Sequence, residues 1–210
     1  MSTIGKIAGK SPVARPPQRK RGEQRVAALL AAAAGVFADK GYATATMTEI
    51  AARAGAPIGS LYQFFPNKEL LGAALMQRYL DLSVEALQHI EATLPSLSPA
   101  ALASALLDVF VDLKTERAVA LALFDSLTPK DDARGAQFRA AMTLHLGRIL
   151  KAKIRGLSAA RADAMALAVL HQMKAAVALD ETGGGKPAVA AQRELRAMLA
   201  RYFEENFSAR

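Results

Sequence analysis

The sequence predicts an all-α protein, and two observations carry this prediction. Alanine, leucine and charged residues with high helix propensity dominate the composition, whereas aromatic residues make up only 6% and β-branched residues are scarce. Apolar residues also recur at three- and four-residue intervals, which is the period of amphipathic helices. With 52% hydrophobic residues among 210, the chain can bury a real core. We expect about nine helices and no β-sheet.

The first 22 residues predict a flexible basic arm. Pro12, Pro16 and Pro17 oppose a helix, and the segment has no hydrophobic period. Residues 1–25 carry seven Lys or Arg side chains against the single acid Glu23, so much of the formal net charge of +8 lies at this end. A solubilising tail and an arm that enters a DNA minor groove both fit this composition.

The composition excludes several classes of protein. The chain has no cysteine, which rules out disulfide bridges, thiolate nucleophiles and cysteine-ligated metals and fits a reducing compartment. The basic N-terminus lacks the apolar segment of a signal peptide, and no run of about 18 apolar residues without a charge occurs. We therefore expect a cytoplasmic protein that does not associate with a membrane.

The ordered part is expected to begin with an amphipathic helix and a capped short helix. Apolar residues at helical spacing run from Glu23 to Gly41, and glycine suits the C-terminal cap of such a helix. Thr46 and Glu49 have the spacing of a capping box, in which each side chain bonds the other residue's backbone amide. The short helix that they open ends at Gly55.

A second short helix follows directly. Pro57 can open it, because a proline loses no hydrogen bond in a first turn, and the helix runs to about Phe65. Small residues at Ala51 and Ala54 let the two short helices approach closely. The pair predicts a helix-turn-helix over residues 46–68.

Six further helices are expected in the remainder of the chain. Asn67 can cap the first of them, Ser98 the second and Ser158 the fifth, and Gly156 ends the fourth. Their expected ranges are 68–95, 99–115, 116–127, 131–155, 158–180 and 187–207.

The segment TMTEIAARAGAPIGSLYQFFPNKELL resembles the DNA-binding domain of the TetR family of bacterial transcriptional regulators. The resemblance spans residues 23–71 and rests on Thr46, Ile50-Ala51, Ala54-Gly55, Leu61-Tyr62, Phe65 and Lys68. The chain departs from the family pattern at Gly55-Ala56-Pro57, where Gly-Val-Ser is more usual, and so lacks one hydroxyl that could reach a phosphate. The resemblance implies a DNA-binding domain over 23–71 and a helical ligand-binding and dimerisation domain over 72–210.

By this resemblance, the second short helix lies in the major groove of a palindromic double-stranded DNA operator. The side chains expected at base edges are Thr48, Ile58, Gly59, Ser60 and Gln63. Glutamine can pair with adenine through two hydrogen bonds, and isoleucine can press on a thymine methyl group. The side chains expected at phosphates are Thr46, Tyr62 and Lys68, which set the register. Taken singly, Tyr62 is also typical of packing, and Lys68 of an ordinary surface cation.

Residues 72–210 carry no comparable motif. Apolar stripes on the last two helices suit pairing with their symmetry mates in a homodimer, although an intramolecular core gives the same pattern. A pocket for a small-molecule effector would be apolar with a few polar groups. Its candidates are Tyr79, Phe110, Lys114, Phe124, Phe138, Met142, His145 and His171, most of which are expected to be core packing. The histidines lack a carboxylate at metal-ligand spacing, so we expect no metal site.

The leading hypothesis is a homodimeric repressor that leaves its operator when a small apolar or amphipathic effector binds. The effector must favour a conformation whose recognition helices are wrongly spaced for half-sites about 34–36 Å apart. Two alternatives stay open: an architectural DNA-binding or protein-interaction module without effector, and a helical enzyme within residues 72–210. No nucleophile–base pair is visible, so we expect no catalytic residue and no cofactor. Repression rather than activation is implied by the resemblance alone.

Overall fold

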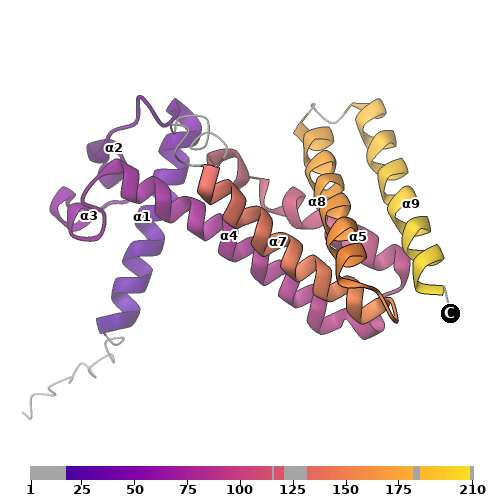
Figure 1. Cartoon of the computed structure of the whole chain (residues 1–210). Coiled ribbons are helices and arrows are strands. Elements are labelled where there is room, and N and C mark those ends of the chain that lie inside the picture. Colours follow the sequence, from indigo (N-terminus) through magenta and orange to yellow (C-terminus); the bar gives the residue numbers. More distant parts are fainter. Residues whose placement is uncertain (1–17, 115, 121–131, 182–184, 209–210) are drawn as a thin grey trace, which may run out of the picture.

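The computed structural model describes residues 18–114, 116–120, 132–181 and 185–208, and these ranges contain helices and turns but no strand. Figure 1 shows the helices along the chain. They are α1 (Gln18–Lys40), α2 (Met47–Arg53), α3 (Ile58–Phe64), α4 (Lys68–Thr93), the short 3-10 helix η1 (Leu94–Ser96), α5 (Pro99–Asp112), α7 (Asp132–Lys153), α8 (Ala159–Glu181) and α9 (Lys186–Ser208). The all-α prediction is confirmed. Of the helix expected over 116–127, only 116–120 are described, and they are helical.

Helix α1 begins earlier than the sequence pattern indicated. It starts at Gln18, so residues 18–22 are helical rather than part of a flexible arm. These residues have no hydrophobic period, but Gln, Arg and Lys are good helix formers, and the last opposing proline is Pro17. The rest of the expected arm, residues 1–17, lies outside the described part of the chain.

The N-terminal unit consists of α1, α2, α3 and the first turns of α4 around one apolar core. Helix α2 contributes Ile50 and Ala51 to this N-terminal core, and α3 contributes Leu61. Gly41 and Gly55 have φ angles of 80° and 59°, which L side chains rarely adopt, and they turn the chain after α1 and after α2. The other buried members of the N-terminal core are Leu29, Leu30, Ala32, Ala33, Val36, Phe37, Tyr42, Ala45, Phe65, Leu71, Leu75, Met76 and Val119.

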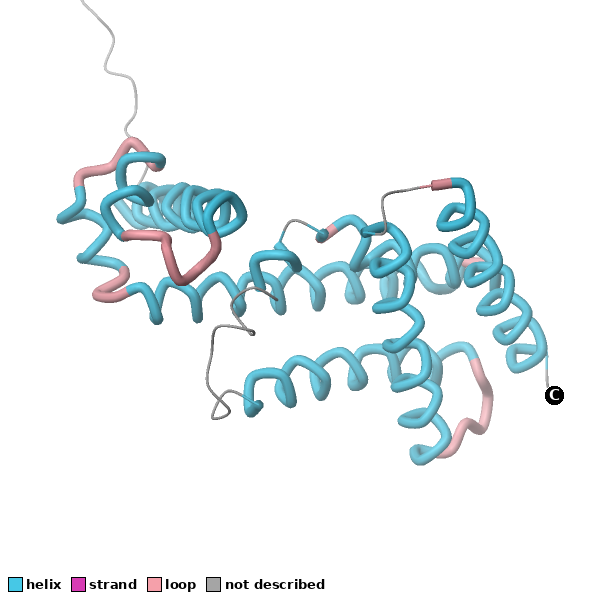
Figure 2. Tube along the Cα trace, turned by 90° about the horizontal axis from the view of Figure 1, so that it is seen from above, coloured by secondary structure: helices cyan, strands magenta, loops and turns pink. Residues whose placement is uncertain are grey.

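Helix α4 joins this unit to the C-terminal body. Its 26 residues span about 39 Å at 1.5 Å per residue. Leu71 and Leu75 lie in the N-terminal core, whereas Tyr79, Leu87 and Ile90 lie in the core of the body. In the body, α5 packs against α8 and α9, and α7 packs against α4 and α8. Figure 2 shows the N-terminal unit and the end of α9 at opposite ends of the molecule.

Among the described residues, one helix of the body is apolar enough, by length and composition alone, to cross a membrane. This segment, Ala159–Asp180, has a mean hydropathy of 1.2 over an 18-residue window, of which 44% is buried inside the protein. Met165, Val169 and Met173 of this helix lie in the body core. Packing within the body therefore accounts for much of its apolar composition.

Candidate nucleic-acid interface and ligand cavity

Helix α3 presents one face to solvent and buries the other. Leu61 is fully buried, whereas Ile58 is 40% exposed and Tyr62 is 48% exposed. Gly59 and Gln63 are exposed as well. Positions 58, 59, 62 and 63 share one face, because residues three and four apart are neighbours on a helix. An isoleucine and a tyrosine thus stand in solvent on a helix that Leu61 anchors to the N-terminal core.

Two further residues expected at DNA lie on α3 and on the preceding helix α2. Ser60 is half-buried on α3, and Thr48 is exposed on α2. The hydroxyl of Tyr62 forms no hydrogen bond within the described residues, so it can donate to or accept from a partner outside the chain. Thr48 and four of the α3 residues are therefore exposed on two helices that pack against each other.

Thr46 holds the start of α2 through the capping box that the sequence predicts. The Glu49 amide donates to the Thr46 hydroxyl at 3.3 Å, and the Thr46 amide donates to Glu49 Oε2 at 3.1 Å. Lys40 at the end of α1 also bonds the Glu49 carboxylate. The bond from Lys40 is the largest cause that lowers the pKa of Glu49, followed by the bonds from Thr46. Thr46 thus stabilises the start of α2, in addition to any contact with phosphate.

Lys68 has a structural role that the sequence did not predict. Its ammonium donates to the carbonyl oxygens of Tyr42, Ala43 and Ala45 at 2.8, 3.0 and 3.1 Å. It also lies 4.7 Å from the centre of the Tyr42 ring. An ammonium has three donors, and these three carbonyls use all of them. Lys68 therefore fixes the turn that leads into α2, and a direct bond to a phosphate would have to replace one of these bonds.

Three aromatic rings from α4, α5 and α7 meet in the body. Tyr79 stacks on Phe138 with ring centroids 5.3 Å apart, and Phe110 lies 6.2 Å from Tyr79 and 6.0 Å from Phe138. Two cavities adjoin the stacked pair, and both are lined by Tyr79 and Phe138. The rings of Tyr79 and Phe138 therefore form a wall that the two cavities share.

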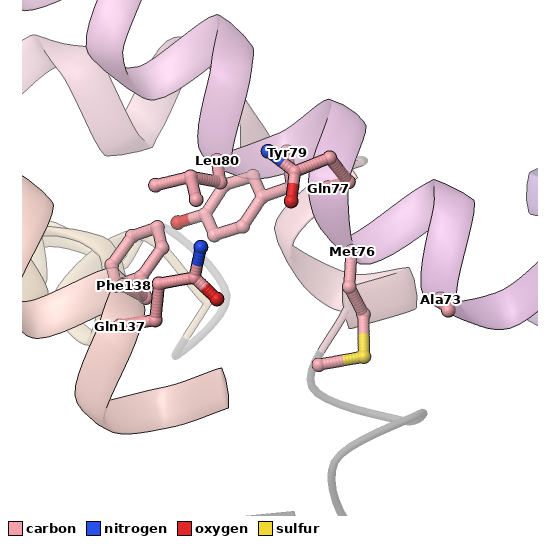
Figure 3. Close-up of a pocket in the computed structure, with 7 residues that line it drawn as sticks. All are labelled: Ala73, Met76, Gln77, Tyr79, Leu80, Gln137 and Phe138. Carbon is pink, nitrogen blue, oxygen red and sulfur yellow. The ribbon is translucent and has the colours of Figure 1, made fainter. Parts of the chain in front are cut away.

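The first cavity, here the glutamine cavity, has a volume of about 250 Å³. Figure 3 shows the side-chain amides of Gln77 and Gln137 beside the rings of Tyr79 and Phe138 in this cavity. Its lining is Ala73, Met76, Gln77, Tyr79, Leu80, Gln137 and Phe138. The cavity combines an aromatic wall with two neutral hydrogen-bonding groups.

The second cavity, here the cationic cavity, has a volume of about 280 Å³. Its lining is Tyr79, Phe110, Arg117, Ala120, Gly135, Phe138, Arg139 and Lys174. Burial lowers the pKa of Lys174, and the positive charges of Arg139 and Arg117 lower it further. The cationic cavity therefore combines the same aromatic wall with three positive side chains.

The other candidates for a pocket lie elsewhere. Met142 is buried in the body core, and His145 is buried with Nδ1 3.9 Å from the Glu91 carboxylate and without a hydrogen bond. Lys114 is exposed and lies 3.7 Å from the Asp180 carboxylate, and His171 is exposed on α8. Phe124 lies outside the described residues. Of the eight candidates, the structure brings Tyr79, Phe110 and Phe138 together at the cavities.

Sequence reasoning missed the polar groups of both cavities. Arg117, Arg139 and Lys174 come from three separate segments, and single cations on amphipathic helices usually face solvent. Only the three-dimensional packing of the body brings them to one place. No sequence signal identifies them, because neither spacing nor composition distinguishes them from the other cations of the chain.

Comparison with known proteins gives one match to a family model and one to a curated regulator. Residues 29–75 match the model described as bacterial regulatory proteins, tetR family. The HTH-type transcriptional activator FasR of Mycolicibacterium smegmatis is 48% identical over 59 residues, which are 28% of this chain and 27% of that protein. The sequence similarity is thus concentrated in a short segment that spans about a quarter of each chain.

Solved structures share the fold over most of the chain. A tetR-family regulatory protein from Rhodococcus RHA1 matches with a TM-score of 0.60 and 23% identity over 88% of this chain and 95% of its own. A TetR transcriptional regulator from Legionella pneumophila gives a TM-score of 0.66 at 19% identity over 83% and 95%. The transcriptional regulator FadR from Bacillus subtilis, in complex with stearoyl-CoA, gives 0.64 at 16% identity over 83% and 97%.

Proposed function

The chain belongs to the TetR family of bacterial regulatory proteins, and we propose that it represses transcription as a homodimer on a palindromic operator until a small molecule releases it. The exposed face of α3 carries this proposal. Ile58, Gly59, Tyr62 and Gln63 stand in solvent on a helix that Leu61 anchors to the N-terminal core. A helix held in this way can enter the major groove with its side chains toward base edges. Its site of action is the cytoplasm, where the operator DNA is accessible.

Base recognition is assigned to Thr48, Ile58, Gly59, Ser60 and Gln63. Gln63 offers a donor and an acceptor that fit the N7 and N6 atoms of adenine, and the exposed Ile58 fits a thymine methyl group. Gly59 has open space where a Cβ would stand, so the backbone can approach the DNA closely. These contacts would determine which DNA sequence the protein binds.

Of the three residues expected at phosphates, Tyr62 is assigned the direct contact, and Thr46 and Lys68 are assigned a positioning role. The Tyr62 side chain is exposed, and its hydroxyl forms no hydrogen bond within the described residues. Thr46 and Lys68 act mainly by positioning, because the hydrogen bonds of both hold the residues that lead into α2. Such contacts set affinity and register rather than sequence preference.

Dimerisation is assigned to α8 and α9 paired with their symmetry mates. Leu167 of α8 is 45% exposed and Met198 of α9 is 62% exposed, and Val189 and Tyr202 of α9 are also exposed. Pairing would bury these apolar side chains in a four-helix arrangement. A single α3 of seven residues reads few base pairs, so a specific operator requires two copies.

The effector is assigned to the cavities beside Tyr79 and Phe138. Tyr79 follows Leu75 by one helical turn, so the same helix lines the cavities and contributes to the N-terminal core. A ligand against Tyr79 can therefore bias the placement of α3 through α4. The ligand of the FadR structure supports the presence of a small-molecule site in a body of this architecture.

We propose repression rather than activation. A dimer bound over a promoter excludes RNA polymerase by occupying the DNA, and this needs no additional protein-binding surface. FasR is named an activator, and its similarity to this chain is confined to 59 residues. A reporter under the operator decides between the two signs. Deleting the regulator raises expression if it represses and lowers expression if it activates.

The test of DNA binding uses the full chain and DNA from upstream of its own gene. We expect the dimer to shift a palindromic fragment, Gln63→Ala to weaken binding at least tenfold, and Gln88→Ala, an exposed change on α4, to have no effect. Equal affinity for an unrelated fragment at the same salt concentration would favour an architectural protein and contradict the proposal.

A further inference from the structure

Helix α3 carries no charged side chain, and the charges next to it in the chain are already engaged. Residues 41–68 contain three charged side chains, Glu49, Arg53 and Lys68, and none of them lies on α3. Glu49 accepts hydrogen bonds at the start of α2, Arg53 bonds Asp39, and Lys68 donates to three carbonyl oxygens. Base contacts from α3 therefore depend on neutral side chains.

This composition limits the bases that α3 can recognise. In the major groove, Arg and Lys bond the two acceptors of guanine, and Asp and Glu accept from the amino group of cytosine. Helix α3 contains none of these four residue types. Its side-chain amide, Gln63, matches adenine instead. The side chains of α3 therefore favour A·T base pairs.

Two apolar side chains border the exposed face of α3. Ile58 and Phe64 are each 40% exposed, and each lies three residues from Leu61, which is fully buried. At about 3.6 residues per turn they stand on opposite sides of Leu61, with Gly59 and Gln63 in the middle of the exposed face. A groove that α3 enters therefore meets an apolar side chain at each border of the helix.

The thymine methyl is the apolar group that base edges present in the major groove. A helix with its side chains is about 10–12 Å wide and the groove about 12 Å, so the borders of the helix contact the groove as well as its middle. Contact of Ile58 and Phe64 with methyl groups would remove apolar surface that is exposed in the free protein. Thymine methyl groups are thus the complementary partners of both side chains.

We infer that α3 selects A·T base pairs in each half-site, with Gln63 on adenine and with Ile58 and Phe64 against the 5-methyl groups of thymines. Phe64 is thereby a further specificity-determining residue. The inference rests on the proposed function, since it names the base pairs that the operator offers to α3. The open space where a Cβ of Gly59 would stand allows the close approach to DNA that these contacts need.

Selection from a random pool of double-stranded DNA tests the base composition. The full wild-type chain, Gln63→Ala and Phe64→Ala would each be used at one salt concentration. The positions at which a variant loses the wild-type preference identify the base pairs that α3 contacts. We expect A·T base pairs at these positions in both half-sites. A wild-type preference for G·C base pairs at these positions would overturn the inference.

Deoxyuridine tests the methyl contacts, because it pairs as thymine does but lacks the 5-methyl group. Fluorescence anisotropy would compare the selected operator with operators in which a single thymine of one half-site is replaced. We expect the wild type to bind about fourfold more weakly when either of two thymines is replaced, one for Ile58 and one for Phe64. Equal affinity for every uridine-containing operator would overturn the inference.

Variants of Phe64 assign one of the two thymines. Phe64→Ala, and the larger polar change Phe64→Gln, should lose the uridine effect at one thymine and keep it at the other. The matched control Leu144→Ala, at an exposed apolar position on α7, should keep both effects. Thermal melting would establish that the variants fold. A folded Phe64 variant that keeps the uridine effect at both thymines would overturn the inference.

The same selection separates this inference from the proposed function. A common palindrome with G·C base pairs at the positions that α3 contacts would leave the proposed function standing and remove the inference. A pool that yields no common sequence would contradict the proposed function itself, and the inference with it.

Discussion

Replacing Lys68 by methionine removes the ammonium that fixes the turn before α2 and keeps an unbranched apolar stem of four heavy atoms. The change leaves the carbonyls of Tyr42, Ala43 and Ala45 without their donor. The bonds to Tyr42 and Ala45 are partly buried, whereas the bond to Ala43 is exposed, so water can replace only the last of them readily. Losing the two partly buried bonds should lower the free energy of unfolding by about 2–4 kcal/mol.

Urea unfolding followed by circular dichroism measures this loss, with Lys151→Met as the control on an exposed lysine. The salt dependence of operator binding gives a second readout. If Lys68 positions the turn, the slope of log affinity against log salt concentration stays the same in the variant. A loss of stability below about 0.5 kcal/mol together with a slope smaller by about 0.9 would refute this reasoning, because it would identify Lys68 as a phosphate contact.

Three further changes test other parts of the structure. Gly35→Ala places a Cβ 2.6 Å from Cζ of Arg53 and so displaces a flexible, exposed side chain that pairs with Asp39. The gain in helix propensity, about 1 kcal/mol, should offset the lost ion pair. The stability measured by thermal melting should therefore not decrease, and a loss of stability above about 2 kcal/mol would contradict this expectation. Glu49→Gln should destabilise the protein at pH 7. Because the folded protein lowers the pKa of Glu49, its contribution is present above the ordinary value of 4.5 and disappears as pH falls through the lowered pKa. The free energies of unfolding of variant and wild type should therefore become equal in acid. A difference between them that stays constant with pH would argue against this role of Glu49. Met198→Glu should convert the dimer to a folded monomer in analytical sedimentation and abolish operator binding, and an intact dimer would exclude α9 from the interface.

The sequence predicted the N-terminal unit well because short-range chemistry determines it. The capping box of Thr46 and Glu49 is a bond between residues three apart, and Gly41 and Gly55 stand where the backbone has a positive φ. Such features depend on neighbours in the chain. The start of α1 was predicted too late, since charged residues after Pro17 carry no hydrophobic period although they favour helix.

The long-range contacts could not be predicted in this way. Lys68 bonds carbonyls 23 to 26 residues earlier in the chain, and no spacing rule links these positions. The cations of the cavity illustrate the same limit, because Arg117 and Lys174 meet only when the body has packed. The sequence identified Tyr79, Phe110 and Phe138 as candidates for a ligand pocket. It could not predict that their rings meet.

Base-by-base specificity tests the central assignment, that the exposed face of α3 reads the operator, most directly. Affinities of wild type and Gln63→Ala would be measured by fluorescence anisotropy on the operator and on every single base-pair substitution of one half-site. We expect wild type to lose about 1–3 kcal/mol at the base pair that Gln63 reads and the variant to lose discrimination at that position alone. A variant that binds all sites more weakly by one common factor, or that discriminates as wild type does, would contradict the account.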